Sequence, residues 1–252
     1  TRQLQMQNAR FREKRVGLID ANEAERVEAN VDGRGIDILK VGPRTWEMTQ
    51  PVEQRADRQQ VRTMLGRTGA LKAMEFTADS PEDLSQWGLE PAPHRVKITM
   101  SGERVVTLRV AEPYLEEGRP VTYVYRDEDD AVYKVKGGFL DAFRESNEVY
   151  RDRLVLGHKE WELKAISVSQ GDDAVTIRQT SGGWRWPDNA AISGSTPRRL
   201  LSLVTDVRAI GFHDEGVSDG GFGEDSMRVS FVHDDVQYEM ILGKKWETPP
   251  ID

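Results

Sequence analysis

The stretch RVEANVDGRGIDILKV, residues 26–41, alternates apolar and polar side chains on both sides of a glycine-containing turn. Successive side chains of a β-strand point to opposite faces, so each half of the stretch collects its apolar residues on one face. An Asp-Gly pair between two alternating runs is a strong short-range signal of a β-hairpin. The stretch therefore predicts an antiparallel hairpin with one buried face.

The same pattern recurs in the second half of the chain at a nearly constant distance. The matched pairs are Val27–Ile166, Ile38–Ile177, Trp46–Trp184 and Phe76–Phe212, and their separation shortens from 139 to 136 residues. A period of this length indicates a duplicated domain, because solenoid units span only about 20–50 residues. We expect residues 1–25 to be the tail of a preceding repeat or a linker, 26–153 to be a first repeat and 154–252 to be a second, truncated repeat.

Each predicted repeat contains one amphipathic helix. Helical spacing is shared by Val61, Met64, Leu65 and Leu71 in the first repeat and by Leu200, Leu201, Val204 and Val207 in the second. Ser195 and Pro197 are typical of a helix start, and a single turn is expected from Ser80, as its cap, to Gly88. The predicted fold class is α+β, with two tandem related repeats, each an antiparallel sheet packed by one principal helix.

Several motifs, in this order, are similar to a known family. They are Trp46, Pro51, Ala56 and Asp57, then WGLEP (87–91), YVYRDEDDAVYKV (123–135) and YRDRLVL (150–156). Together they resemble the bacterial domain-of-unknown-function family 4340. The resemblance implies an envelope-associated protein with an N-terminal membrane anchor, often encoded beside ABC-transporter and gliding-motility-type components, and it supplies no catalytic residues. The chain departs from the family by lacking the anchor and by Ala111 in place of a glycine, which the second repeat keeps as Gly243.

Composition excludes several classes of function. The net charge of −8 argues against nucleic acid as the main partner, because binding phosphates requires a surplus of Lys and Arg. The chain has no cysteine, which excludes disulfides, thiolate metal sites and cysteine nucleophiles. No apolar run reaches the roughly 18 residues of a membrane-spanning helix. Membrane association is therefore expected only through a missing anchor or a partner.

The candidate ligand or partner surface combines one tryptophan with an acidic loop. Trp46 and Trp184 occupy matching positions and are interpreted as core residues, whereas Trp186 matches Met48 and is the better candidate for stacking on a sugar. The loop HDEGVSDGGFGED, residues 213–225, has the oxygen ligands that calcium prefers but lacks the EF-hand pattern. The candidate residues are Trp186, Asp214, Glu215, Asp219, Glu224 and Asp225.

No catalytic or metal-binding constellation is recognised. His94, His158, His213 and His233 are far apart in sequence and lack the spacing of a zinc motif. A hydrolase would require a cleft in which a histidine lies within a few ångströms of two carboxylates. We therefore expect a non-catalytic scaffold or partner-binding module of a membrane-associated assembly, without cofactors, on the extracytoplasmic side of a bacterial envelope. A glycan- or calcium-binding module and a hydrolase with an unrecognised site are the alternatives.

Overall fold

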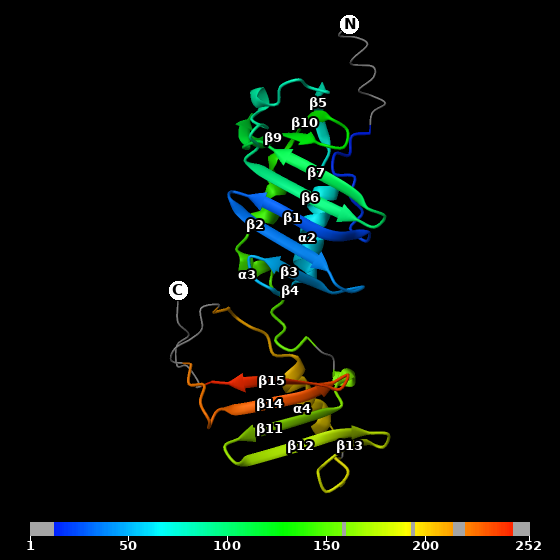
Figure 1. The fold of residues 1–252 in the computed structure, drawn as a ribbon, viewed down its shortest axis with the longest axis vertical. Coiled ribbons are helices and arrows are strands. Elements are labelled where there is room, and N and C mark those ends of the chain that lie inside the picture. The colour runs from blue at the N-terminus through cyan, green and yellow to red at the C-terminus, as the bar shows by residue number, and fades with distance from the viewer. Residues whose placement is uncertain (1–12, 158–159, 193–194, 214–219, 244–252) are drawn as a thin grey trace. The chain divides into compact units, whose positions relative to one another are not determined.

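The computed structural model describes residues 13–157, 160–192, 195–213 and 220–243. The chain divides into two compact units, Thr1–Asp152 and Arg153–Asp252, called unit 1 and unit 2 below. Both are built mainly from antiparallel sheet with few helices, in agreement with the predicted α+β class (Figure 1).

Unit 1 contains one large antiparallel sheet. Its strands are β1 (Ala24–Val31), β2 (Arg34–Lys40), β3 (Trp46–Gln50), β4 (Gln54–Ala56), β5 (Ala73–Asp79), β6 (His94–Met100), β7 (Arg104–Val110), β8 (Tyr114–Glu116), β9 (Arg119–Arg126) and β10 (Ala131–Lys136). Their order across the sheet is β4-β3-β2-β1-β6-β7-β9-β10-β5, with β8 paired to β9. The helical segments are α2 (Arg58–Gly69), η1 (Ser85–Trp87), η2 (Gly137–Phe143) and α3 (Asn147–Tyr150).

The predicted hairpin is confirmed as β1 and β2. Val27 lies opposite Ile38, and the turn is Asp32–Gly33, with φ angles of 53° and 74°. Positive φ at both central residues is the signature of the two-residue turn that matches strand twist, and glycine adopts it without steric cost. Val27 and Ile38 are fully buried, so the inner face of the hairpin lies in the core.

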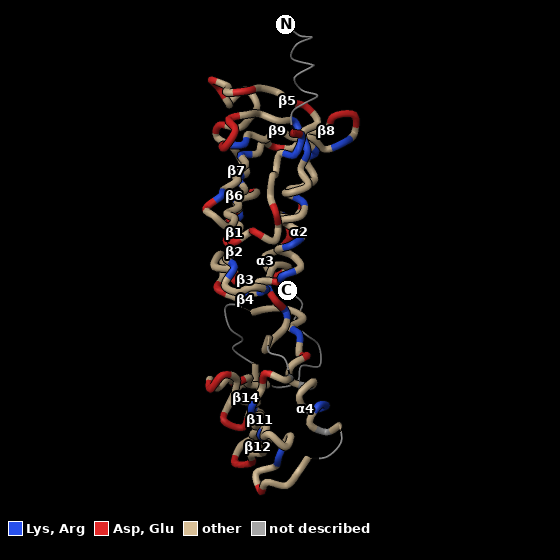
Figure 2. Tube along the Cα trace, turned by 90° about the vertical axis from the view of Figure 1, so that its right-hand side faces the viewer, with Lys and Arg blue, Asp and Glu red and all other residues tan. Residues whose placement is uncertain are grey.

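Helix α2 covers the inner face of the sheet between its two edge strands, β4 and β5 (Figures 1 and 2). The side chain of Asp57 accepts hydrogen bonds from the backbone N–H groups of Gln59 and Gln60 and so caps the first turn. The predicted helical face is buried, although Leu71 lies beyond the last helical residue, Gly69.

A separate small core covers the outer face of the sheet near β9 and β10. Leu84 and Leu89 pack there against Ala111 and Val132. The predicted cap at Ser80 is wrong: the turn η1 starts at Ser85, and the side chain of Asp83 accepts the backbone N–H of Ser85 at 2.8 Å. Ser80 instead donates its own N–H to the carbonyl of Asp130 at 2.7 Å, directly after the last residue of β5 and not at a helix start.

Unit 2 contains a smaller antiparallel sheet with one principal helix. Its elements are η3 (Glu160–Glu162), β11 (Ala165–Gln170), β12 (Asp173–Thr180), β13 (Gly183–Arg185), α4 (Thr196–Thr205), β14 (Met227–His233) and β15 (Val236–Leu242), and the strand order is β13-β12-β11-β14-β15. Leu201 and Val204 of α4 pack with Ile166 and Phe231 of the sheet. Ser195 precedes α4 as predicted, but its side chain makes no capping hydrogen bond.

Removing the cap of α2 should destabilise unit 1 selectively. Asp57→Ala deletes both capping hydrogen bonds, which typically costs about 1 kcal/mol, whereas Asp57→Asn keeps a side-chain acceptor. Hydrogen-exchange mass spectrometry should show faster exchange of the α2 amides in Asp57→Ala and unchanged protection in β11 and β14. Equal protection of α2 in both variants would show that the cap contributes nothing.

Candidate functional site

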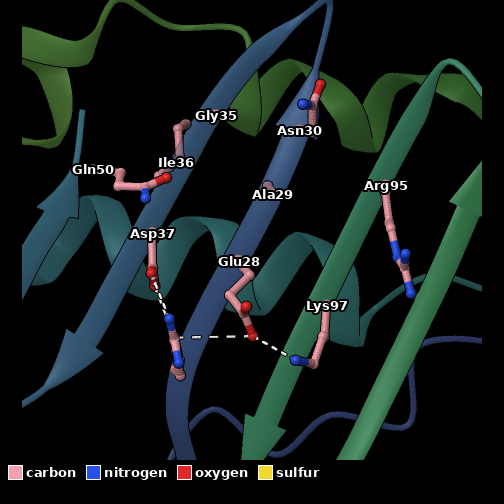
Figure 3. Close-up of a pocket in the computed structure, with 10 residues that line it drawn as sticks. Glu28, Ala29, Asn30, Gly35, Ile36, Asp37, Gln50, Arg95 and Lys97 are labelled. Carbon is pink, nitrogen blue, oxygen red and sulfur yellow. Dashed lines mark hydrogen bonds and ion pairs between the residues drawn. The ribbon is translucent and has the colours of Figure 1, made fainter.

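The outer face of the unit 1 sheet carries an array of paired charges over β2, β1 and β6, called the open face below. Strand alternation directs Arg26, Glu28 and Asn30 away from the core, because Val27 and Ala29 point into it. Figure 3 shows Asp37, Glu28 and Lys97 on the neighbouring strands, with their ion pairs dashed. The surface is therefore assembled by pairing between strands and not by one segment.

The charges of the open face form a continuous chain of contacts. Arg26 donates from Nε and Nη2 to the two carboxylate oxygens of Asp37, at 2.9 and 2.6 Å. Lys97 Nζ lies 2.8 Å from Glu28 Oε2, and Arg26 Nε lies 3.9 Å from the same oxygen. The bidentate Arg26–Asp37 contact fixes the guanidinium in one orientation.

The ion pair with Arg26 favours the ionised form of the Asp37 carboxyl group. The hydrogen bond from Arg26, opposed in part by desolvation, lowers the pKa of the Asp37 carboxyl below its usual value. The same hydrogen bond raises the pKa of the Arg26 guanidinium. A general acid or base at neutral pH requires the opposite shift of a carboxyl group, toward 7. The pair therefore suits electrostatic recognition better than proton transfer.

A shallow hollow of about 460 Å³ opens beside the ion pairs. Gly35 contributes no side chain there, and the exposed Asn30, Gln50 and Arg95 surround it (Figure 3). The Arg95 side chain is 60% exposed, and its Nη2 lies 3.9 Å from Asp127 Oδ2. The hollow thus offers amide and guanidinium groups to a polar partner.

The array continues onto β7 and the turn after β9. Arg109 Nε lies 2.9 Å from Asp127 Oδ1, and the Arg109 guanidinium lies over the Tyr125 ring at 5.3 Å from its centroid. Figure 2 shows Lys and Arg interspersed with Asp and Glu along these strands. Mixed charges of this kind suit a protein surface with complementary charges.

The outer face of unit 2 carries hydroxyl groups at its centre, with Arg178 and Arg185 paired opposite each other on β12 and β13. Ser167 and Thr176 lie opposite each other on β11 and β12, and their hydroxyl groups hydrogen bond at 2.9 Å. An ion pair between Arg228 and Glu239, at 2.9 Å, lies farther along that sheet. The two sheets therefore differ in the chemistry of their outer faces.

Of the sequence-predicted site residues that the structure describes, Glu224 and Asp225 lie together, and Trp186 does not line their cavity. Trp186 is half-buried and packs against the unit 2 core, together with Trp184. Glu224 and Asp225 line a cavity of about 490 Å³ at the ends of β14 and β15, while Asp214, Glu215 and Asp219 lie outside the described residues. Within the described ranges, no three His, Cys, Asp or Glu side chains are grouped to hold a metal ion.

An aromatic cavity in unit 2 was missed by the sequence reasoning. Trp161, 71% exposed, lines a hollow of about 520 Å³ with Trp184, Gln179 and Arg198. Trp161 belongs to no repeated motif, so only its place in the fold identifies it. The alternation in the sequence indicates which residues of these strands point away from the core. Which of them pair across strands is known only from the strand register.

His94 lies within a few ångströms of two carboxylates, as the hydrolase alternative requires, but it does not line an accessible cleft. Its Nδ1 lies 3.6 Å from Asp32 Oδ1 and its Nε2 lies 3.4 Å from Glu112 Oε2. The side chain is only 1% exposed, so a substrate cannot reach it in this conformation. Asp32 also pairs with Arg144, at 2.9 Å, and these contacts connect the β1–β2 turn to the segment after η2.

Comparisons with known proteins point to one family. A family model described as "Domain of unknown function (DUF4340)" matches residues 46–221, more than two thirds of the chain, from β3 to the loop before β14. No curated protein and no solved structure matches the chain. None of the described helices has the length and apolar character needed to span a bilayer.

The Arg26–Asp37 pair should make stability depend on pH in the acid range. Because the pKa of Asp37 is lowered in the folded protein, its stabilisation is complete above the ordinary value of about 3.9 and is lost as the pH falls through the folded pKa. Asp37→Asn should cost about 1 kcal/mol at pH 7 and give a shallower loss between about pH 5 and 2, measured by urea unfolding. Parallel pH curves for both proteins would contradict this role.

Proposed function

We propose that this chain, which belongs to the family described as Domain of unknown function (DUF4340), is a non-catalytic module that binds protein partners of a membrane-associated assembly. The open face of unit 1 carries the proposal. A sheet face with interlocked, fixed charges beside a shallow polar hollow is suited to docking a protein surface. We further propose that units 1 and 2 are tandem copies of one fold.

The strand registers of the two units support the duplication. Under the sequence alignment, Val27 of β1 corresponds to Ile166 of β11. Val27 lies opposite Ile38 and Ile98, while Ile166 lies opposite Ile177 and Phe231, and these are the residues aligned in sequence. A register slip of one residue would turn every apolar side chain to the other face. The matching registers of β1 and β11 with both of their neighbouring strands therefore support the duplication.

The segments that precede each sheet make matching hydrogen bonds. In unit 1, Val16 N–H donates to the Leu71 carbonyl at 2.8 Å, and Ala73 N–H donates to the Lys14 carbonyl at 2.7 Å. The corresponding bonds in unit 2 are Val155 to Val207, at 3.0 Å, and Ala209 to Arg153, at 2.7 Å. These matching bonds support grouping residues 14–16 with the first copy, whereas the sequence predicts the tail of a preceding repeat or a linker for residues 1–25.

The contrast between the copies supports a binding role for the open face. The aligned core residues are apolar in both units, whereas Arg26, Glu28 and Asp37 correspond to Ala165, Ser167 and Thr176. The fold is built in unit 2 without these charges, so the fold does not require them. Charges that the fold does not require, even where they add stability, are candidates for recognition.

We also propose that the module works on the extracytoplasmic side of a bacterial envelope, beside ABC-transporter-type components. The family resemblance supports this location, and the absence of cysteine is compatible with it. Proteinase K added to intact spheroplasts of the native host should digest the protein. Protection that is lost only on lysis would place it in the cytoplasm and refute the location.

Site-specific photo-crosslinking tests the partner role. A photoreactive residue at Asn30, on the open face, should give a discrete adduct in the native host, whereas one at the aligned Ser169 of unit 2 should not. The double variant Arg95→Glu/Lys97→Glu should reduce the adduct at least about tenfold, or ~1.4 kcal/mol. The matched variant Arg228→Glu should leave it unchanged.

Equal adducts from Asn30 and Ser169 would contradict a partner-binding open face. So would an Asn30 adduct that the double variant Arg95→Glu/Lys97→Glu leaves unchanged. Native hydrogen-exchange profiles of the charge-reversal variants would establish that the sheet still folds.

A glycan-binding role is the second candidate, favoured by the aromatic cavity. An exposed tryptophan beside amide and guanidinium donors, as at Trp161, Gln179 and Arg198, is suited to stacking on a sugar ring. Calorimetric titration with peptidoglycan disaccharide should then show binding that Trp161→Ala abolishes and Trp161→Phe weakens only a fewfold. Titration with calcium tests the acidic loop separately. No heat with either ligand would remove this candidate.

A further inference from the structure

Arg95, on the open face, shares a distant carboxylate with a second arginine. It lies directly opposite Arg109 in the β6–β7 register, and like charges in that position destabilise a strand pair. Asp127 contacts both, with Oδ1 2.9 Å from Arg109 Nε and Oδ2 3.9 Å from Arg95 Nη2. Among the described residues, the Arg95 guanidinium donates no hydrogen bond. Arg95 therefore has the capacity to bind a further carboxylate.

The counterpart of Arg95 in unit 2 shows where a carboxylate fits beside such an arginine. Under the proposed alignment of the two units, Arg95 corresponds to Arg228 and Thr107 corresponds to Glu239. In unit 2, Arg228 donates from Nη1 to Glu239 Oε2 at 2.9 Å. Because Thr107 is not acidic, β7 of unit 1 supplies no carboxylate at the position where β15 of unit 2 does.

Two amide side chains lie in the same cross-strand row as Arg95. Asn30 is paired with Arg95 on one side and with Gly35 on the other. Gln50 Oε1 comes within 4.0 Å of the position that a Cβ of Gly35 would occupy. Figure 3 shows this row crossing the hollow from Gln50 to Arg95. In the part of the chain that the structure describes, neither amide side chain makes a hydrogen bond. The row thus presents polar groups on both sides of a position without a side chain.

We propose that the open face binds an extended acidic segment of the partner protein, whose Asp or Glu carboxylate pairs with Arg95 as Glu239 pairs with Arg228. The segment crosses the strands over Gly35, and its main chain binds the two amide side chains of the row. This inference rests on the proposed partner-binding role of the open face and names the chemistry of the partner segment.

A carboxylate suits this position better than a phosphate. It only accepts hydrogen bonds, and a guanidinium binds it through two parallel N–H···O bonds, as Arg26 binds Asp37 on the same face. Glu28 and Asp37 also line the hollow. These two anions repel a phosphate monoester, which carries nearly two negative charges, more strongly than they repel a carboxylate with one.

A short peptide is long enough to test the row. Three inter-strand spacings separate β6 from β3, or about 14 Å, and five extended residues span about 16 Å. The probe is acetyl-Ser-Gly-Glu-Gly-Ser-amide, and the control peptide has Gln in place of Glu. In NMR titrations of the full chain, the probe should shift the side-chain N–H resonances of Asn30, Gln50 and Arg95, with a Kd on the order of 1 mM. The control peptide should bind at least tenfold more weakly.

Variants of the chain identify the arginine that binds the carboxylate. Arg95→Gln should lower the affinity for the probe at least tenfold. Arg95→Lys keeps the charge without the planar fork and should lower the affinity only a fewfold. Arg228→Gln, at the aligned arginine that already binds Glu239, should leave the affinity unchanged. Unchanged backbone resonances of β10 establish that each variant folds.

Three results overturn the proposal. They are equal affinity for the probe and control peptides, affinity for the probe that Arg95→Gln leaves unchanged, and no shift at a probe concentration about tenfold above the expected Kd.

Other sources of the carboxylate give distinct results. If the acidic residues of this chain at Asp214, Glu215 and Asp219 occupied Arg95, replacing them with amides would strengthen probe binding at least tenfold and overturn the proposal. A concentration-dependent dimer that Arg95→Gln dissociates would assign the carboxylate to a second copy and would also overturn it.

The peptide titration and the photo-crosslinking experiment fail independently. An Asn30 photo-adduct without probe binding refutes only the carboxylate inference. Probe binding that depends on Arg95, without any Asn30 photo-adduct, supports the carboxylate site and refutes the partner-binding role of the open face.

Discussion

One-sided burial of antiparallel sheet is the constraint on which this protein depends. In unit 1, Val27, Ile38 and Ile98 lie side by side on the inner face of β1, β2 and β6 and are fully buried. Burying side chains of this size contributes roughly 1.5–3 kcal/mol each. In unit 1 the opposing apolar surface comes from α2 together with Phe139, Leu140 and Phe143 of η2. In unit 2 it comes mainly from α4.

Burial on one face leaves the other face free to vary. In unit 1 that face carries the Arg26–Asp37 and Lys97–Glu28 pairs, and in unit 2 the aligned strands carry hydroxyl groups. Near β9 and β10, the outer face is instead covered by Leu84 and Leu89, so unit 1 itself contains an open and a closed region. The open region is therefore a feature of the surface sequence rather than a requirement of the fold.

The extent of each sheet depends on strands that are distant in sequence. β5 follows α2 and forms a strand because β10 lies beside it. After α4, the segment of unit 2 makes an isolated bridge between Leu154 and Arg208. Pairing with a strand that is distant in sequence thus decides that β5 forms a strand.

The sequence by itself determined the local elements. Alternation and Asp-Gly specified the β1–β2 hairpin, the spacing of Val61, Met64 and Leu65 specified α2, and the ordered motifs specified the family, because each signal lies within a short stretch of chain. The short strands β4 and β8 and the seven-residue strand β5 were not predicted, since each depends on a partner strand.

Only the tertiary structure decided the candidate surfaces. The register set Lys97 beside Glu28, although 69 residues separate them, and folding placed Trp161 next to Trp184. It also packed the half-buried sugar-stacking candidate Trp186 against a core and buried His94 between two carboxylates. These outcomes depend on strand order and side-chain packing between distant segments, which local periodicity does not encode.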